Sequence, residues 1–137
     1  MLELRLNELD SVVDKFVICE ATYTHQGKDK PLYFEQNKHL FEPFLHKIIH
    51  VVSSEKPSGW EQNNWLLENK QRLDLKLGLK GSQQNDVVII SDLDEIPSAE
   101  KIKIHANEAG IKVLMLKNHY YFLNIRDVKF EGSLLSL

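Results

Sequence analysis

The sequence DVVIISDLDEIP, residues 86–97, decides the fold class of this chain. Val87–Ile90 is a run of β-branched residues, which is typical of a fully buried strand in a parallel sheet. Asp92, Asp94 and Glu95 follow at its carboxyl end, where open α/β sheets bind ligands. Neighbouring carboxylates are costly without a cation, and oxygen ligands suit Mg²⁺ or Mn²⁺. The stretch therefore predicts a divalent metal whose open positions are filled by substrate phosphates.

The segments on either side alternate between helix-like and strand-like patterns. We expect strands at 16–19, 48–52, 87–91, 111–116 and 120–125, and helices at 2–13, 34–46, 60–79 and 98–109. Pro43 indicates a short or broken second helix, and Leu66, Leu73 and Leu77 form one apolar face of the third. The alternation predicts an α/β fold with a mostly parallel sheet flanked by helices. The sequence has no glycine-rich phosphate loop, so metal and side chains would hold a nucleotide.

Composition narrows the class of protein. A length of 137 residues predicts a single domain over 1–137, and a net charge of −3 without a basic run makes nucleic acid an unexpected partner. The lone cysteine, Cys19, excludes an internal disulfide and fits a reducing compartment. No stretch approaches the roughly 20 apolar residues of a transmembrane segment, and the start has no signal-peptide pattern. We therefore expect a cytoplasmic chain, and the terminal SLLSL looks like a strand cut from a longer protein, so the domain is expected to be truncated.

Three blocks of the sequence resemble glycosyltransferase family 17 in their order and spacing. They are KFVICEATYTHQGKDKPLYF at 15–34, WLLENKQRLDLKLGL at 65–79 and DVVIISDLDEIPS at 86–98. The resemblance runs from about Leu4 to Gly132. It implies a GT-A-like, Rossmann-type domain that binds a nucleotide sugar. It also implies an inverting enzyme that moves N-acetylglucosamine from UDP-GlcNAc to a mannose or another sugar hydroxyl of a glycan acceptor, as the members that modify N-glycans do.

The resemblance assigns the metal site to the DxD motif. Asp92 and Asp94 would be the ligands of Mn²⁺ or Mg²⁺ and of the nucleotide, with Glu95 as a neighbouring support. By analogy with other enzymes of this fold type, Asp94 contacts the metal directly, while Asp92 takes the ribose or a metal-bound water. The base that accepts the proton of the acceptor hydroxyl must lie across the sugar from the motif. Glu131 is a candidate by default only.

Four further residues are candidates for binding the nucleotide, each with a simpler alternative. Glu20 ends the first strand and could face the nucleotide or the loop, or could cap a helix. His25 could hydrogen-bond to uridine or phosphate, or face solvent. Lys30 could meet phosphate, or be a solvated loop lysine. Arg72 could bind the diphosphate through its planar fork, or form an i,i+4 ion pair with Glu68.

Two other functions fit parts of the sequence. Family members are longer at both ends, so the chain could be a truncated module that binds a nucleotide sugar and transfers nothing. A phosphatase of the haloacid dehalogenase type also places DxD after an apolar strand, with Asp92 as nucleophile and Asp94 as general acid. That pattern usually has Thr or Val where this chain has Ile96. The acceptor and the oligomeric state do not follow from the sequence.

Overall fold

The computed structural model of the chain describes residues 1–116, 118–119, 126–127 and 134–136. They fall into two compact units, one made of Met1–Val13 with Gln83–Leu137 and the other of Asp14–Ser82. Each unit is described by itself. The predicted single domain over 1–137 stays a prediction.

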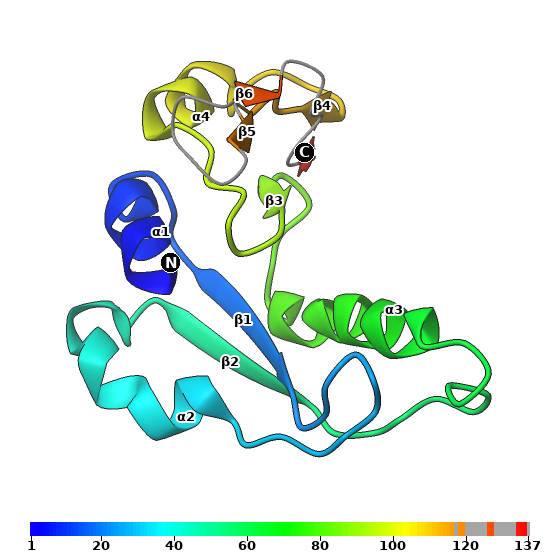
Figure 1. Cartoon of the computed structure of the whole chain (residues 1–137). Helices are drawn as coiled ribbons and strands as arrows, with labels where there is room; N and C mark the ends of the chain where they lie inside the picture. The colour runs from blue at the N-terminus through cyan, green and yellow to red at the C-terminus, as the bar shows by residue number, and fades with distance from the viewer. Residues whose placement is uncertain (117, 120–125, 128–133, 137) are drawn as a thin grey trace. The chain divides into compact units, whose positions relative to one another are not determined.

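The unit of residues 14–82 is built on a pair of parallel strands (Figure 1). β1 (Phe16–Ala21) pairs with β2 (Ile48–Ser53) over their full length, with Phe16 opposite Ile48 and Ala21 opposite Ser53. Both predicted strands and their parallel direction are thus confirmed. Because the carboxyl ends of parallel strands meet at one edge, the loops that follow β1 and β2 leave the sheet on the same side.

The connection between these strands is helical but broken, as Pro43 predicted. It consists of α2 (Tyr33–Asn37) and the 3-10 segment η1 (Lys38–Phe44), which contains the proline. Phe41 has φ −113° and ψ 21°, which is outside the helical region. A proline has no N–H to donate, so a regular helix cannot run through this position.

The predicted helix at 60–79 divides into α3 (Trp65–Asp74) and the 3-10 segment η2 (Leu75–Leu79). Its buried face differs from the apolar face predicted from the leucines. Leu67, Asp74 and Gly78 are buried, whereas Leu73 and Leu77 are 55% and 50% exposed. The physical reason is that Leu67, a glycine and a paired aspartate, rather than Leu73 and Leu77, face the strands.

Gly78 is the point of closest approach between η2 and β1. A Cβ atom at this position would lie 2.3 Å from Cγ1 and 2.8 Å from Cγ2 of Val17. Those distances are well inside van der Waals contact, and neither β1 nor η2 can shift without disturbing its other contacts. Only glycine fits here.

We predict that Gly78→Ala destabilises the protein by about 1–3 kcal/mol through overpacking against Val17. Without the clash, alanine would stabilise a helical position by up to about 1 kcal/mol relative to glycine. The sign of the change in the free energy of unfolding therefore shows by itself whether the clash with Val17 is present. The measurement is urea unfolding of the wild type, both single variants and the double variant with Val17→Ala. The penalty should shrink in the Val17→Ala background, and a stabilising Gly78→Ala in the wild-type background would contradict the packing argument.

A buried polar network fixes α3 to both strands. Lys70 Nζ donates to both carboxylate oxygens of Asp74, at 2.5 and 2.6 Å. The Ser53 hydroxyl also hydrogen-bonds to Asp74 and lies 3.0 Å from the Tyr23 hydroxyl. Burial acts to raise the pKa of Asp74, but the bonds from Lys70 and Ser53 and the charge of Lys70 outweigh it, so that the pKa is lowered. Asp74 is therefore a charged, fully engaged group in the core of this unit.

This network makes a pH-dependent contribution to stability. A carboxyl group whose pKa is lowered on folding stabilises the folded state above its unfolded pKa of about 3.9, and this stabilisation is lost as the pH falls through the lower folded value. We predict that Asp74→Asn costs about 1–3 kcal/mol at neutral pH and progressively less below about pH 4. Urea unfolding from pH 2 to 7 measures the difference, with the exposed Asp14→Asn as the control. A difference that does not change with pH would show that the Asp74 charge is not involved.

The other unit contains α1 (Leu2–Leu9), β3 (Val88–Ile90) and α4 (Ala99–His105). β4 (Lys112–Val113) and β3 both pair with β7 (Leu134–Ser136), so that the order is β3-β7-β4. β5 (Asn118–His119) pairs with β6 (Arg126–Asp127). All of these pairs are antiparallel.

Three expectations about this unit need correction. The predicted strand at 87–91 is only Val88–Ile90, it is antiparallel, and Ile90 is 48% exposed, so it is not a fully buried parallel strand. A β-branched run favours an extended backbone, but it determines neither which strand pairs with it nor whether its two faces are buried. Among the described residues, parallel pairing occurs only between β1 and β2, so the mostly parallel sheet is wrong for this part of the chain, while the α/β class is confirmed.

The remaining predicted elements are present in shortened form. The helix at 2–13 ends at Leu9, and the helix at 98–109 spans Ala99–His105. The strand at 111–116 is reduced to Lys112–Val113, and the strand at 120–125 lies outside the described residues. No helix in the described ranges combines the length and apolar character needed to cross a bilayer.

Candidate functional site

The DLDE turn, residues 92–95, follows β3 and is closed by its own hydrogen bonds. The Glu95 N–H donates to the Asp92 carbonyl oxygen at 3.1 Å, and the Asp92 N–H donates to Glu95 Oε2 at 3.2 Å. Glu95 thus closes the turn from within, and its predicted support of a metal or nucleotide stays a prediction. Asp92 and Asp94 are both exposed. The turn therefore presents two carboxylates to solvent on a closed backbone.

Arg5 of α1 also holds the DLDE turn, through hydrogen bonds to its backbone and to Ser91. Its Nη1 donates to the carbonyl oxygens of Asp92 and Glu95, at 3.0 and 2.9 Å, and its Nη2 donates to the Ser91 hydroxyl. Burial lowers the pKa of Arg5, and the nearby Glu95 and Asp92 carboxylates oppose that shift. Sequence reasoning missed Arg5, because 87 residues separate it from Asp92 and no local pattern links them.

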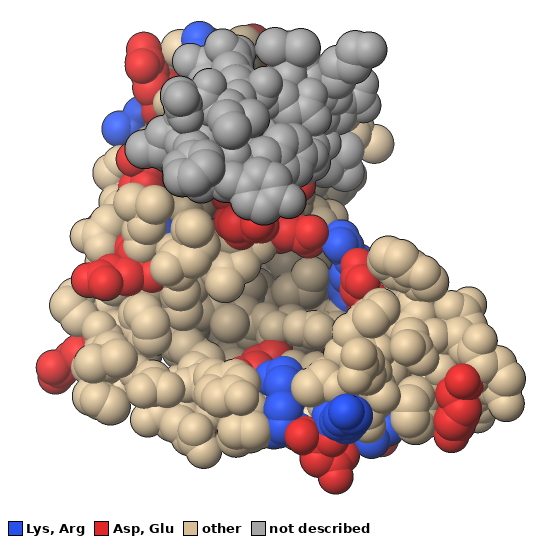
Figure 2. Space-filling model, viewed as in Figure 1, with Lys and Arg blue, Asp and Glu red and all other residues tan. Residues whose placement is uncertain are grey.

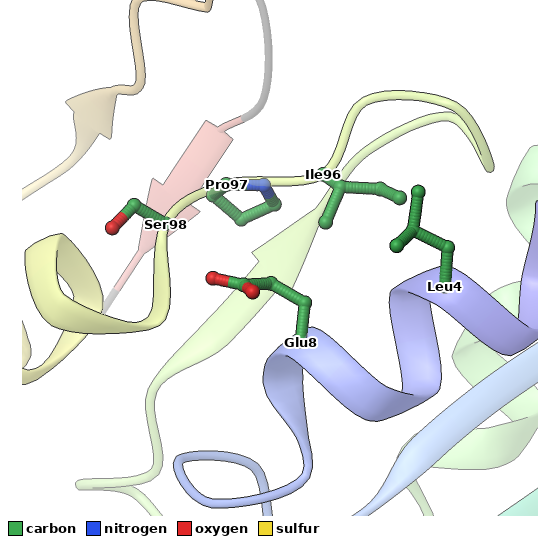
Figure 3. A pocket seen from close by; sticks show the side chains of 5 residues that line it. All are labelled: Leu4, Glu8, Ile96, Pro97 and Ser98. Atoms are coloured by element: carbon green, nitrogen blue, oxygen red, sulfur yellow. The ribbon is translucent and has the colours of Figure 1, made fainter.

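A pocket of about 330 Å³ lies directly after the turn (Figure 3). Its lining comes from α1 and from the segment before α4: Leu4, Glu8, Ile96, Pro97 and Ser98. Figure 3 shows the Leu4 and Glu8 side chains rising from α1 toward that segment. Oε1 of Glu8 accepts a hydrogen bond from the Ala99 N–H at 3.2 Å, so its carboxylate is held at the start of α4. The pocket has apolar walls and one anchored carboxylate.

The second group of candidate residues lies in the unit of residues 14–82, around the loop that follows β1. A pocket of about 160 Å³ is lined there by Tyr23, Thr24, His25, Leu67, Glu68 and Gln71. Gln71 Nε2 donates to the Cys19 carbonyl oxygen at 2.9 Å, which ties α3 to β1 beneath the pocket. The hollow therefore opens at the carboxyl end of β1, the edge at which α/β folds place ligands.

Glu68 brings His25 and Arg72 together beside this pocket. Arg72 Nη2 lies 3.0 Å from Glu68 Oε1, so the i,i+4 ion pair that was the alternative for Arg72 is present, and His25 Nδ1 lies 3.8 Å from Glu68 Oε2. The His25 ring also meets the Trp65 ring edge-on, with centroids 5.5 Å apart. The side chains of His25 and Arg72 are about half exposed, at 52% and 53%. Both can reach a ligand, and their roles at a diphosphate stay predictions.

Glu20 and Lys30 form a separate cluster. The buried Glu20 carboxylate accepts the Phe34 N–H at 3.1 and 3.2 Å, at the start of α2. Lys30 Nζ lies 3.7 Å from Glu20 Oε1, and the buried His50 Nε2 lies 3.4 Å from Glu20 Oε2. The cap that was the alternative for Glu20 is therefore present, and its nucleotide-binding role stays a prediction.

We predict that Glu20→Ala destabilises the protein by about 2 kcal/mol or more, because it leaves the buried Phe34 N–H, the Lys30 ammonium and the His50 Nε2 atom without their shared partner. Glu35→Ala is the matched control. Glu35 is 50% exposed and also lies beside His50, so its removal should cost less than about 1 kcal/mol. Urea unfolding compares the two variants. Equal penalties would mean that Glu20 is not the centre of this cluster.

Three further expectations concern the catalytic base, the metal site and the surface charge. Glu131, the default candidate for the base, lies outside the described residues. In the described part of the chain, no three His, Cys, Asp or Glu side chains gather closely enough to hold a metal ion. A metal at the DLDE turn would therefore need further ligands from a substrate or from water. On the face shown in Figure 2, basic side chains lie beside acidic ones and form no continuous patch among the described residues.

Comparison with known proteins defines the class. The sequence matches the family model of glycosyltransferase family 17 over residues 1–127. The chain belongs to this family.

Three curated proteins are similar in sequence to this chain. The chain is 34% identical over 108 residues to the human β-1,4-mannosyl-glycoprotein 4-β-N-acetylglucosaminyltransferase, and equally so to the rat protein. The mouse protein is 33% identical over the same length. These alignments cover 74% of this chain but 20% of each relative, so the chain spans about a fifth of their length. No solved structure matches the chain.

Proposed function

We propose that this chain is the donor-binding part of an inverting glycosyltransferase with a GT-A-like fold. The enzyme would move N-acetylglucosamine from UDP-GlcNAc to the hydroxyl of a mannose or another sugar. The observation that carries the proposal is the family match over residues 1–127, which includes a DLDE turn with both aspartates exposed after a strand. The relatives named above support N-acetylglucosamine as the transferred sugar.

The DLDE turn fits a divalent cation of the Mn²⁺ or Mg²⁺ type. Asp92 and Asp94 would hold it, with Asp94 as the direct ligand. Two exposed carboxylates, with no cluster of three His, Cys, Asp or Glu side chains among the described residues, suit an ion that takes its other ligands from phosphate and water. When bound, the cation offsets the negative charge that develops on the diphosphate leaving group.

The residues beside the pocket at the end of β1 would bind and orient the nucleotide. Arg72 offers a planar fork that suits two phosphate oxygens, and His25 can donate to uridine or phosphate. Because Arg72 is paired with Glu68, an arriving diphosphate has to replace that carboxylate. Lys30 would add positive charge near the same loop, although Glu20 already partly neutralises it. The acceptor hydroxyl needs a base on the opposite face of the sugar, and Glu131 stays the candidate.

One alternative function has an observation in its favour. The chain spans about a fifth of its curated relatives, so it could bind the nucleotide sugar without transferring it. A phosphatase of the haloacid dehalogenase type has no such support, because the family model that matches residues 1–127 is that of a glycosyltransferase family.

We predict that UDP-GlcNAc binds in the presence of Mn²⁺, and that Asp94→Asn weakens this binding at least about tenfold because a neutral amide is a poor ligand for a hard cation. Calorimetric titration with and without Mn²⁺ measures the effect. Glu100→Gln, which removes an exposed acidic group of α4, should bind like the wild type.

Three outcomes separate the proposals. Binding that requires Mn²⁺ and is lost in Asp94→Asn, followed by transfer to a mannose-bearing acceptor, supports the transferase. The same binding without transfer supports the non-catalytic module. A folded wild type that binds no UDP-GlcNAc with Mn²⁺ overturns both readings of the donor site for this chain.

A further inference from the structure

We propose that Arg5 is the positioning residue of the DLDE turn: its guanidinium fixes the backbone from which Asp92 and Asp94 project. The part of this proposal that concerns metal and nucleotide rests on the proposed function. The part that concerns the order of the turn does not, because it follows from contacts within one compact unit. Arg5 acts through the turn and is not itself placed in contact with a substrate.

The geometry of the contacts supports a positioning role. One guanidinium reaches the carbonyl oxygens of Asp92 and Glu95, the two ends of the turn, and also the Ser91 hydroxyl just before it. A planar group with several fixed donors can satisfy such acceptors together, whereas the single ammonium of lysine sits on a flexible stem. The two ends of the turn are thus joined through one rigid side chain, in addition to the bond between the Glu95 N–H and the Asp92 oxygen.

The helix that carries Arg5 provides a firm base. Leu6 and Leu9 of α1 are almost completely buried, at 0% and 2% exposure. Glu8, one helical turn after Arg5, accepts the Ala99 N–H at 3.2 Å. Two polar side chains on α1 therefore hold the segment from 91 to 99 near its beginning and at its end. The DLDE turn is held directly by the first of these attachments, through Arg5.

The charge of Arg5 has a separable effect. Arg5 donates to two main-chain oxygens and to the Ser91 hydroxyl, so its hydrogen bonds order the backbone of the turn. Its positive charge nevertheless lies near Asp92 and Glu95 and reduces the repulsion among the carboxylates of the turn. Arg5→Lys retains the positive charge but not the planar guanidinium, whereas Arg5→Gln removes both. Comparing the two variants therefore separates the effect of charge from that of geometry.

The first test is amide hydrogen exchange in the ligand-free protein. Arg5→Gln and Arg5→Lys should both speed exchange at the Glu95 amide about tenfold, because each breaks the clamp that keeps this turn closed. The core strands β1 and β2 serve as the internal reference for global stability. Asn7→Ala is the control, because Asn7 is an exposed residue of α1 whose side chain donates to the Glu3 carbonyl oxygen within the same helix. Unchanged exchange in Arg5→Gln, or full rescue by Arg5→Lys, overturns the positioning role.

The second test is Mn²⁺-dependent binding of UDP-GlcNAc by the same variants. A disordered turn should weaken binding about tenfold in Arg5→Gln and in Arg5→Lys, while the affinity of Asn7→Ala stays at the wild-type level. Wild-type affinity in Arg5→Gln would overturn the link between the turn and the metal. If the wild type itself fails to bind, the proposed donor site fails, but the exchange experiment still decides whether Arg5 orders the turn.

Discussion

The buried Asp74 carboxylate is the constraint on which the unit of residues 14–82 depends. It accepts two bonds from Lys70 of its own helix and one from Ser53 at the end of β2, and Ser53 in turn lies beside the Tyr23 hydroxyl just after β1. A buried charge tolerates little displacement, because each lost bond leaves a desolvated group behind. The network therefore sets both the position and the rotation of α3. That rotation turns Leu67 and Gln71 toward the strands and places Glu68 and Arg72 at the rim of the pocket.

The same principle operates at the DLDE turn with the charges reversed. There a half-buried cation, Arg5, satisfies backbone oxygens of a turn on which both aspartates are exposed. In both places a long-range polar contact, rather than apolar packing alone, orients the side chains that the family resemblance assigns to the donor. A site that must hold a diphosphate needs such fixed groups, because ordering them during binding would cost affinity.

The sequence predicted what short-range patterns encode. Apolar and β-branched runs located β1, β2 and β3, Pro43 located the break between the strands, and the spacing of Glu68 and Arg72 allowed their ion pair as one of two alternatives. It could not predict the direction or partner of β3, because strand-forming residues do not specify what lies beside them. It also misjudged α3, where leucine spacing suggested the wrong inner face, since the contact depends on Gly78 and on the satisfied charge of Asp74. The role of Arg5 could not be predicted either, because its partners lie 86 to 90 residues away in the sequence.

The pairing of Arg72 with Glu68 has a consequence for how a nucleotide would bind. An exposed ion pair contributes little to stability, typically under about 1 kcal/mol, so it is readily exchanged. A diphosphate offers more charge and a geometry that suits the guanidinium fork, and it would displace Glu68 at small cost. The displaced carboxylate still has His25 nearby, 3.8 Å away, as an alternative partner. Glu68 would thus hold Arg72 in place before the donor arrives and give it up when the donor binds, which makes the ion pair a compatible neighbour of the proposed donor site rather than an obstacle to it.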